Sequence, residues 1–126
     1  MPNQYFVRAS VDPTNEYAVC TYYYDQAGQQ PVGGSELTIS ETAGSCAIGS
    51  ADGSSLALLA ATFKTIGAPA SMSGRNFVST DDNGFIQVPM PTDTVVHKGV
   101  VLLFSTPDEV ECLYASADPV VVNSDD

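Results

Sequence analysis

The sequence predicts one mainly β domain spanning residues 1–126, a β-sandwich or small barrel of about seven strands with one short α-helix at about residues 55–66. Three observations support this prediction. The 126 residues are enough for one domain with its own hydrophobic core. Hydrophobic residues make up 44% of the chain, which is typical of a globular protein. Most apolar segments are short, rich in β-branched and aromatic residues, and separated by turn residues.

The N-terminal part of the chain predicts two strands followed by a loop. The segment QYFVRAS is a candidate strand with Tyr5 and Val7 on one face. The segment EYAVCTYYY, residues 16–24, is dominated by β-branched and aromatic residues. Both of its faces carry apolar side chains, so we expect a strand that is covered on both sides. Residues 25–35, DQAGQQPVGGS, predict a loop that is mobile or contacts a partner.

The next segments predict one clear strand and one weaker strand. ELTISE alternates apolar and polar residues, which places Leu37 and Ile39 on an inward face. The following segment, TAGSCAIGSADGSS, has little periodicity and many small residues. We therefore expect a loop there, with a short strand near residues 46–48.

The helix is predicted within SSLALLAATFKTIG. Its apolar residues recur at spacings of three and four, as one stripe of a helix requires; they are Leu56, Leu59, Phe63 and Ile66. Ser54 or Ser55 is a candidate N-cap, and Gly67 and Pro69 are candidate stop signals. A strand through SLALLAATF is the alternative. We prefer the helix because alanine is plentiful and β-branched residues are few.

The C-terminal half predicts further strands. RNFVST and GFIQVPM flank a turn, and residues 92–105 form a long segment that is rich in valine. Lys98-Gly99 is a candidate hairpin or bulge within that segment. Residues 110–123 predict one final strand, or two strands separated by ASADP.

The stretch STDDNG is a candidate calcium loop, but it fails the ligand pattern. An EF-hand loop needs an acidic residue at its first position and a Glu six residues after its Gly. Alignment on Gly84 places Ser79 at the first position and Met90 at the last. Asn-Gly between two apolar segments is instead a strong hairpin signal. We therefore expect a turn in which Asp81 and Asp82 accept backbone hydrogen bonds, and no metal site.

The charge composition disfavours two classes of partner. Fifteen acidic residues face four Lys and Arg residues, so the formal net charge is −11. Four cations cannot neutralise a run of phosphates, which disfavours direct nucleic-acid binding. Binding to an anionic membrane is disfavoured for the same reason. Only 15% of the residues are charged, so uncharged polar residues finish the surface, which suits a protein that meets neighbours.

Catalytic and metal chemistry have weak support in the sequence. Cys46 lies in a glycine-rich segment and His97 is the single histidine, but nothing in the sequence brings them together. Cys20, Cys46 and Cys112 form no local pair with zinc-ligand spacing. We expect three reduced and mostly buried thiols, with one disulfide and one free thiol as the alternative. No catalytic residue, cofactor or metal is predicted.

No targeting or membrane-spanning segment is visible in the sequence. MPNQYFVRAS has no basic start followed by an apolar core, and the longest apolar run, GVVLLF, is too short to span a bilayer. We therefore expect a protein that is made in the cytoplasm without a signal peptide, with a virion as its candidate destination.

The tyrosine-rich segment and the loop after it form the predicted interaction region. Tyrosine suits protein interfaces and also stacks on sugars. The loop adds Gln, Gly and Pro residues that are not expected to pair in a sheet. The predicted interface residues are Tyr22, Tyr24, Gln29, Gln30, Pro31 and Val32.

Together these features predict a non-catalytic structural or interaction subunit of a homo-oligomeric assembly, whose partners are itself or other shell proteins. The most concrete version is a viral particle protein that decorates a capsid or associates with a tail. Acidity, few lysines and a surface rich in Ser, Thr and Gly favour this version. The alternative is a small carbohydrate- or peptide-binding module that uses the Tyr22–Tyr24 region.

Overall fold

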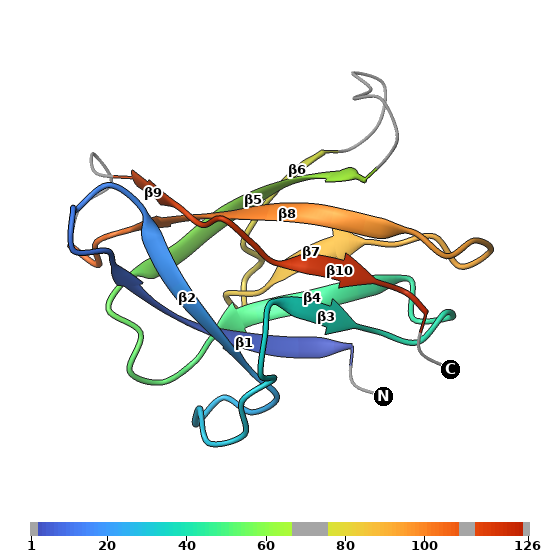
Figure 1. Ribbon diagram of the computed structural model, residues 1–126, viewed down its shortest axis with the longest axis horizontal. Coiled ribbons are helices and arrows are strands. Elements are labelled where there is room, and N and C mark those ends of the chain that lie inside the picture. Colours follow the sequence, from blue (N-terminus) through green and yellow to red (C-terminus); the bar gives the residue numbers. More distant parts are fainter. Residues whose placement is uncertain (1–2, 67–75, 109–112, 125–126) are drawn as a thin grey trace.

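Two β-sheets pack face to face in the computed structural model, which describes residues 3–66, 76–108 and 113–124 (Figure 1). The described residues form ten strands and no helix. The strands are β1 (Gln4–Val11), β2 (Ala18–Tyr23), β3 (Glu36–Thr38), β4 (Ser45–Ser50), β5 (Ala57–Thr65), β6 (Phe77–Ser79), β7 (Ile86–Pro89), β8 (His97–Ser105), β9 (Leu113–Ala115) and β10 (Val120–Val122). The predicted β-sandwich is therefore confirmed, with more strands than the seven expected.

The two sheets differ in size. The four-stranded sheet has the order β2-β1-β4-β7, and the six-stranded sheet has the order β3-β10-β8-β5-β6, with β9 also paired to β8. Most neighbouring strands are antiparallel, but β1 and β4, like β3 and β10, are parallel pairs. The chain crosses between the sheets five times: from β2 to β3, β3 to β4, β4 to β5, β6 to β7 and β7 to β8. Neither sheet is therefore built from one continuous segment of the chain.

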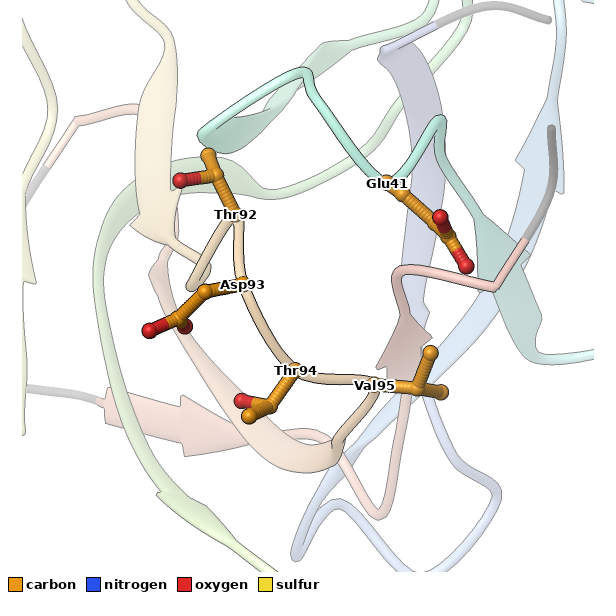
Figure 2. A pocket seen from close by; sticks show the side chains of 5 residues that line it. All are labelled: Glu41, Thr92, Asp93, Thr94 and Val95. Carbon is orange, nitrogen blue, oxygen red and sulfur yellow. The ribbon is translucent and has the colours of Figure 1, made fainter.

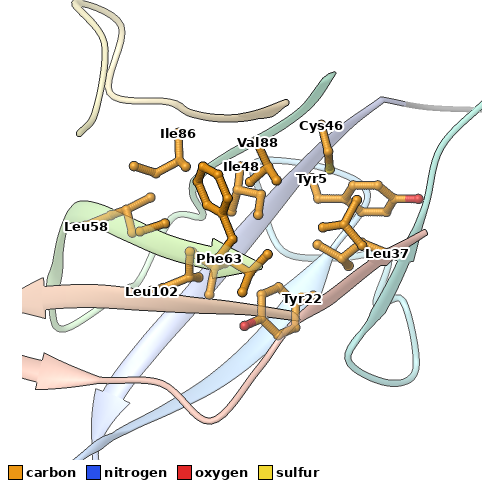
Figure 3. Packing of buried hydrophobic residues seen from close by; sticks show 14 of the residues in the cluster. Tyr5, Tyr22, Leu37, Cys46, Ile48, Leu58, Phe63, Ile86, Val88 and Leu102 are labelled. Atoms are coloured by element: carbon orange, nitrogen blue, oxygen red, sulfur yellow. The ribbon is translucent and has the colours of Figure 1, made fainter. Parts of the chain in front are cut away.

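Inward side chains from both sheets form one hydrophobic core (Figure 3). Tyr5 and Val7 on β1 face this core, as predicted, and so do Val100, Leu102 and Phe104 on β8. These residues lie at every second position of their strands, because successive side chains of a strand point to opposite faces. Each fully buried side chain of this size stabilises the fold by about 1.5–3 kcal/mol.

Several other strand predictions are confirmed. Leu37 and Ile39 are fully buried, and the weaker strand near residues 46–48 is part of β4. The final segment forms two strands, β9 and β10. The long valine-rich segment forms β8, which runs through Lys98-Gly99 without the hairpin or bulge that we considered there.

The predicted helix at residues 55–66 is wrong, and the strand alternative is right. This segment forms β5, which pairs antiparallel with β8 from Ala57↔Ser105 to Thr65↔Lys98. The ladder satisfies the backbone groups of both strands and buries one face of each. This non-local pairing overrides the helical preference of the alanines.

A β-bulge explains why the segment lacks the pattern of a strand. The register with β8 shifts at Leu59, which is the extra residue of the bulge. The shift places Leu58, Ala61 and Phe63 on the inner face of the sheet. Their spacing of three and then two residues breaks the two-residue period of a strand, so the segment lacks the alternation that indicates a strand.

The expectation that residues 16–24 are covered on both sides is wrong for most of the strand. Ala18 and Tyr22 face the core, but Val19 and Thr21 on the opposite face are exposed. Tyr23 is the exception, because it lies on the same face as Val19 and Thr21 and is buried.

The turn at residues 80–85 is confirmed, but the hairpin is wrong. One carboxylate oxygen of Asp81, Oδ1, accepts hydrogen bonds from the N–H groups of Asn83 and Phe85, both at 2.9 Å. Gly84 has a φ of 82°, which favours glycine at this point of the turn. The flanking strands β6 and β7 belong to different sheets, so the turn carries the chain from one sheet to the other.

The connection between β1 and β2 is held by the buried carboxylate of Asp12. Its oxygens accept hydrogen bonds from the N–H groups of Thr14 at 2.9 Å, Glu16 at 2.7 Å and Tyr17 at 2.8 Å, and from the Thr14 hydroxyl. Burial disfavours the charged carboxylate, but these hydrogen bonds outweigh that effect and lower the pKa of Asp12 to about 2.

We predict that Asp12 makes the fold sensitive to acid. Its folded-state pKa of about 2 lies below its ordinary value of 3.8, so its contribution is present above the ordinary value and is lost as the pH falls toward 2. Asp12→Asn should lower the Tm at neutral pH and flatten the fall of Tm in acid. Asp93→Asn, which changes an exposed loop carboxylate, should do neither. Thermal unfolding followed by circular dichroism measures both effects, and an unchanged acid slope in Asp12→Asn would contradict the prediction.

Candidate interaction surfaces

Arg8 on β1 holds together the region that was predicted as an interface. Its guanidinium lies over the Tyr23 ring, 4.8 Å from the ring centroid, and Nη1 donates a hydrogen bond to the Tyr23 hydroxyl at 3.0 Å. Nε donates to the carbonyl of Asp52 at 2.9 Å, and Nη2 donates to the carbonyl of Ala27 at 3.3 Å. Arg8 thus fixes two separate loops against the outer face of the four-stranded sheet.

The loop at residues 25–35 is folded back on β2 at its start. The Asp25 carboxylate accepts hydrogen bonds from the N–H groups of Gln29 at 3.0 Å and Gln30 at 2.9 Å. The Tyr24 N–H donates to the carbonyl of Gln30 at 2.9 Å. These contacts shape the first half of the loop into a defined turn.

The predicted interface residues lie in different environments. Tyr22 is 1% exposed, and its hydroxyl donates to Asp118 Oδ1 at 2.7 Å, so it is a core residue. Tyr24 is 42% exposed, and its ring centroid lies 5.7 Å from that of Tyr5. Val32 is half-buried against the core. The remaining three are exposed: Gln29, Gln30 and Pro31.

The structure does not bring Cys46 and His97 together. Cys46 is fully buried on β4, and this burial raises the pKa of its thiol to about 12, so the thiol is protonated at neutral pH. His97 is exposed on β8, where alternation directs it away from the core. Cys20 is a free thiol like Cys46, and Cys112 lies outside the described residues.

A hollow of about 110 Å³ is lined by Glu41 and the loop residues 92–95 (Figure 2). In Figure 2 the Asp93 carboxylate points away from Glu41, so the two acidic groups do not converge. Four of the five lining residues are consecutive, whereas binding sites usually gather polar groups from several elements. The hollow therefore follows from the bend of one loop.

A second hollow, of about 360 Å³, lies beside the edge of β2. The carbonyl of Tyr22 accepts a hydrogen bond from the Val32 N–H at 2.9 Å, so Tyr22 directs its backbone groups away from β1. By the alternation of an antiparallel strand, Cys20 directs its N–H and C=O to the same free edge. The lining residues are Cys20, Thr21, Tyr22, Pro31, Gly33, Gly34, Ser35 and Asp118.

The outer face of the four-stranded sheet is partly covered by the chain's own side chains. Phe6, Tyr23 and Ala51 form a small buried cluster there, with Phe85 packed against it. The ring centroids of Phe6 and Phe85 are 5.8 Å apart. Gly49 leaves room for this packing, because a Cβ at its position would lie 2.6 Å from the Phe85 ring.

The outer face of the six-stranded sheet carries a group of open apolar side chains, which lie among the exposed polar residues Thr62, Ser79 and His97. Three large residues on it are more than half exposed: Ile66 at 54%, Phe77 at 53% and Leu113 at 56%. Three more are half-buried beside them: Val101, Leu103 and Val120. These six residues are here called the apolar face. The strand pairing directs them outward, opposite to the core residues of the same strands.

One row of paired residues crosses this face and carries charge only at its ends. The row consists of Lys64 on β5, Gly99 on β8, Val120 on β10 and Glu36 on β3. A shallow hollow of about 440 Å³ lies over Gly99, bounded on one side by Ile66 and on the other by Pro119. Because Gly99 has no side chain, the centre of the apolar face is recessed.

The sequence does not reveal the apolar face, because its members lie on strands that meet only through non-local pairing. One signal was available in β8, where Val101 and Leu103 alternate with the inward Val100 and Leu102. A strand that is apolar on both faces indicates that both faces are covered. The strand next to β8 in the sheet is β5. Because the sequence predicts a helix there, the outer apolar surface cannot be followed from β8 to its neighbour.

Comparison with known proteins supplies no relative. No protein-family model, curated protein or solved structure matches this chain significantly. Within the described residues no helix is long and apolar enough to cross a membrane.

We predict that a side chain at Gly28 would displace the Arg8 guanidinium from its contacts. Gly28 has a φ of 73°, and a Cβ at its position would lie 2.0 Å from Arg8 Nη2. Gly33 has a similar φ of 89° but open space around it, so Gly33→Ala reports backbone strain alone, about 1 kcal/mol. Gly28→Ala should therefore lower the free energy of unfolding by more than Gly33→Ala does, as measured by urea unfolding.

The same comparison in an Arg8→Ala background is the control. There the clash is removed, so the two glycine substitutions should have equal effects. Equal effects in the presence of Arg8 would show that the guanidinium contact does not restrict Gly28.

Proposed function

We propose that this chain is a non-catalytic structural subunit of a homo-oligomeric assembly and that it self-associates through the apolar face. The concrete version is a viral particle protein that decorates a capsid or associates with a tail. Acidity and a charged fraction of only 15% support that version, because they are typical of a surface that meets neighbours and avoids phosphates.

The contrast between the two outer faces supports self-association. The four-stranded sheet covers part of its outer face with Phe6, Phe85 and the Arg8 contacts, whereas Ile66, Phe77 and Leu113 remain open on the six-stranded sheet. Soluble monomers rarely expose contiguous apolar patches of more than a few hundred Å². A partner that buries these side chains removes this unfavourable contact with water.

The size of the face suits a specific interface. The nine residues of β8 extend over about 30 Å, and four neighbouring strands span about 20 Å, which gives a footprint on the order of 600 Å². A standard interface buries about 800 Å² on each partner. Two such faces are therefore close to the area that a stable dimer needs.

The charge distribution also favours the apolar face over the rest of the surface as the site of self-association. A formal net charge of −11 makes copies of the chain repel one another at most orientations. In the row that crosses the apolar face, one carboxylate is balanced by one lysine, Glu36 by Lys64. Copies can therefore approach through this face with little repulsion.

We predict that Val101→Glu prevents self-association, because it places an unpaired charge at the centre of the apolar face. Val19→Glu is the matched control, since Val19 is an exposed valine on the other sheet, at 45%. Sedimentation velocity at micromolar concentrations should show oligomers for the wild type and Val19→Glu, and monomers for Val101→Glu. A wild-type chain that is strictly monomeric would contradict the proposal.

The second candidate function is a small carbohydrate- or peptide-binding module that uses the Tyr22–Tyr24 region. The hollow beside β2 favours the peptide version, because the free backbone groups of Cys20 could pair with an extended chain. Cys20→Pro would remove the outward N–H without breaking the ladder to β1. Binding of short extended peptides that survives this substitution would argue against strand addition at β2.

A further inference from the structure

We infer that two copies pack apolar face to apolar face across a twofold axis that runs along the strands between β8 and β10. In this arrangement Lys64 of each copy meets the partner's Glu36. The inference rests on the self-association proposed above and specifies its geometry.

The cross-strand row fixes where the axis must lie. Its four residues are Lys64, Gly99, Val120 and Glu36, and its midpoint lies between Gly99 and Val120. Neighbouring strands are about 4.8 Å apart, so the two charged ends stand about 7 Å on either side of that midpoint. A twofold axis through the midpoint and parallel to the strands reverses the row in the second copy. Each end of the row in one copy therefore faces the opposite end of the row in the other copy.

The charges select this axis over the perpendicular one. An axis that runs along the row itself would place Lys64 against the partner's Lys64 and Glu36 against the partner's Glu36. Like charges held opposite each other in an interface oppose association. With the axis along the strands, both contacts become attractive, and they occur twice because a twofold interface is self-complementary.

The shape of the face agrees with the same axis. Gly99 and Val120 stand on either side of the midpoint, so the partner's Val120 lies opposite Gly99. The hollow of about 440 Å³ over Gly99 gives that side chain a place to insert. Facing sheets pack about 10 Å apart, a separation across which lysine and glutamate side chains can reach each other.

Charge reversal tests the pairing directly. Lys64→Glu and Glu36→Lys should each weaken dimerisation at least about 10-fold, because each substitution creates two repulsive contacts. The double variant Lys64→Glu/Glu36→Lys should restore affinity to within about 3-fold of the wild type, since both pairs are attractive again. Both residues are exposed, so the fold should tolerate the changes, which thermal unfolding of each variant checks.

Net charge and the local pairing make opposite predictions for one variant. Glu36→Lys makes the chain less acidic, so general repulsion between copies would weaken and association would strengthen. The inference instead requires weaker association. Glu16→Lys makes the same charge change on an exposed loop and is the control for Glu36→Lys. The control for Lys64→Glu is the double variant Gln4→Glu/Gln26→Glu, which lowers the net charge by the same amount.

Gly99→Val tests the hollow without adding charge. A Cβ at Gly99 would meet Ile66 at 3.6 Å, which is ordinary contact, and β-branched residues are favoured in strands. The added side chain should fill the hollow, displace the partner's Val120 and weaken dimerisation. Val95→Ala, which shortens an exposed loop residue outside the row, should leave dimerisation unchanged.

Sedimentation equilibrium of the full chain and its variants separates the outcomes. Loss of dimer in both single reversals with recovery in the double reversal supports the twofold arrangement, and the single effects should shrink at high salt. Unchanged dimerisation in the single reversals, together with loss in Val101→Glu, would overturn the twofold pairing while leaving the proposed self-association intact. A monomeric wild type would overturn both.

Discussion

The antiparallel ladder between β5 and β8 is the constraint on which the rest of the structure depends. These are the longest described strands, with nine residues each, and β6, β9 and β10 all attach to one of them. Their inward residues, such as Phe63 and Leu102, supply a large part of the core, and their outward residues carry the centre of the apolar face. Both the stability of the sandwich and its candidate interaction surface thus follow from one pairing of distant segments.

Local signals in the sequence predict much of the sandwich. Alternation places Leu37 and Tyr5 in the core, and the Asp-Asn-Gly sequence ending at Gly84 predicts a turn. Such signals describe neighbours along the chain but not partners across it. The turn after β6 was therefore expected to join paired strands, although it joins different sheets, and β5 was expected to be helical because its bulge removes the two-residue period.

The candidate surfaces could be predicted less well than the fold, because each depends on segments that meet only after folding. Tyr22 and Tyr24 lie two residues apart and so on the same side of the chain, yet Tyr22 is buried within β2, whereas Tyr24 follows the end of β2 and is exposed. Arg8 has no distinguishing local pattern, and its importance arises from the loops that bring Ala27 and Asp52 to it. The two outer faces consequently have different roles: one is used within the chain, and the other is available to a neighbour.

The bulge at Leu59 also determines how this part of the chain can tolerate changes in its length. Loss of Leu59 would turn the bulge into a regular ladder, in which Leu58 still pairs with Phe104 and faces the core. Loss of a residue from the regular part of β5, residues 60–65, would instead reverse the orientation of the side chains on one side of the gap. A replacement at Leu59 itself would keep every other side chain on its proper face. Among natural variants of this segment, a gap of one residue should therefore be more common at the bulge than elsewhere in β5.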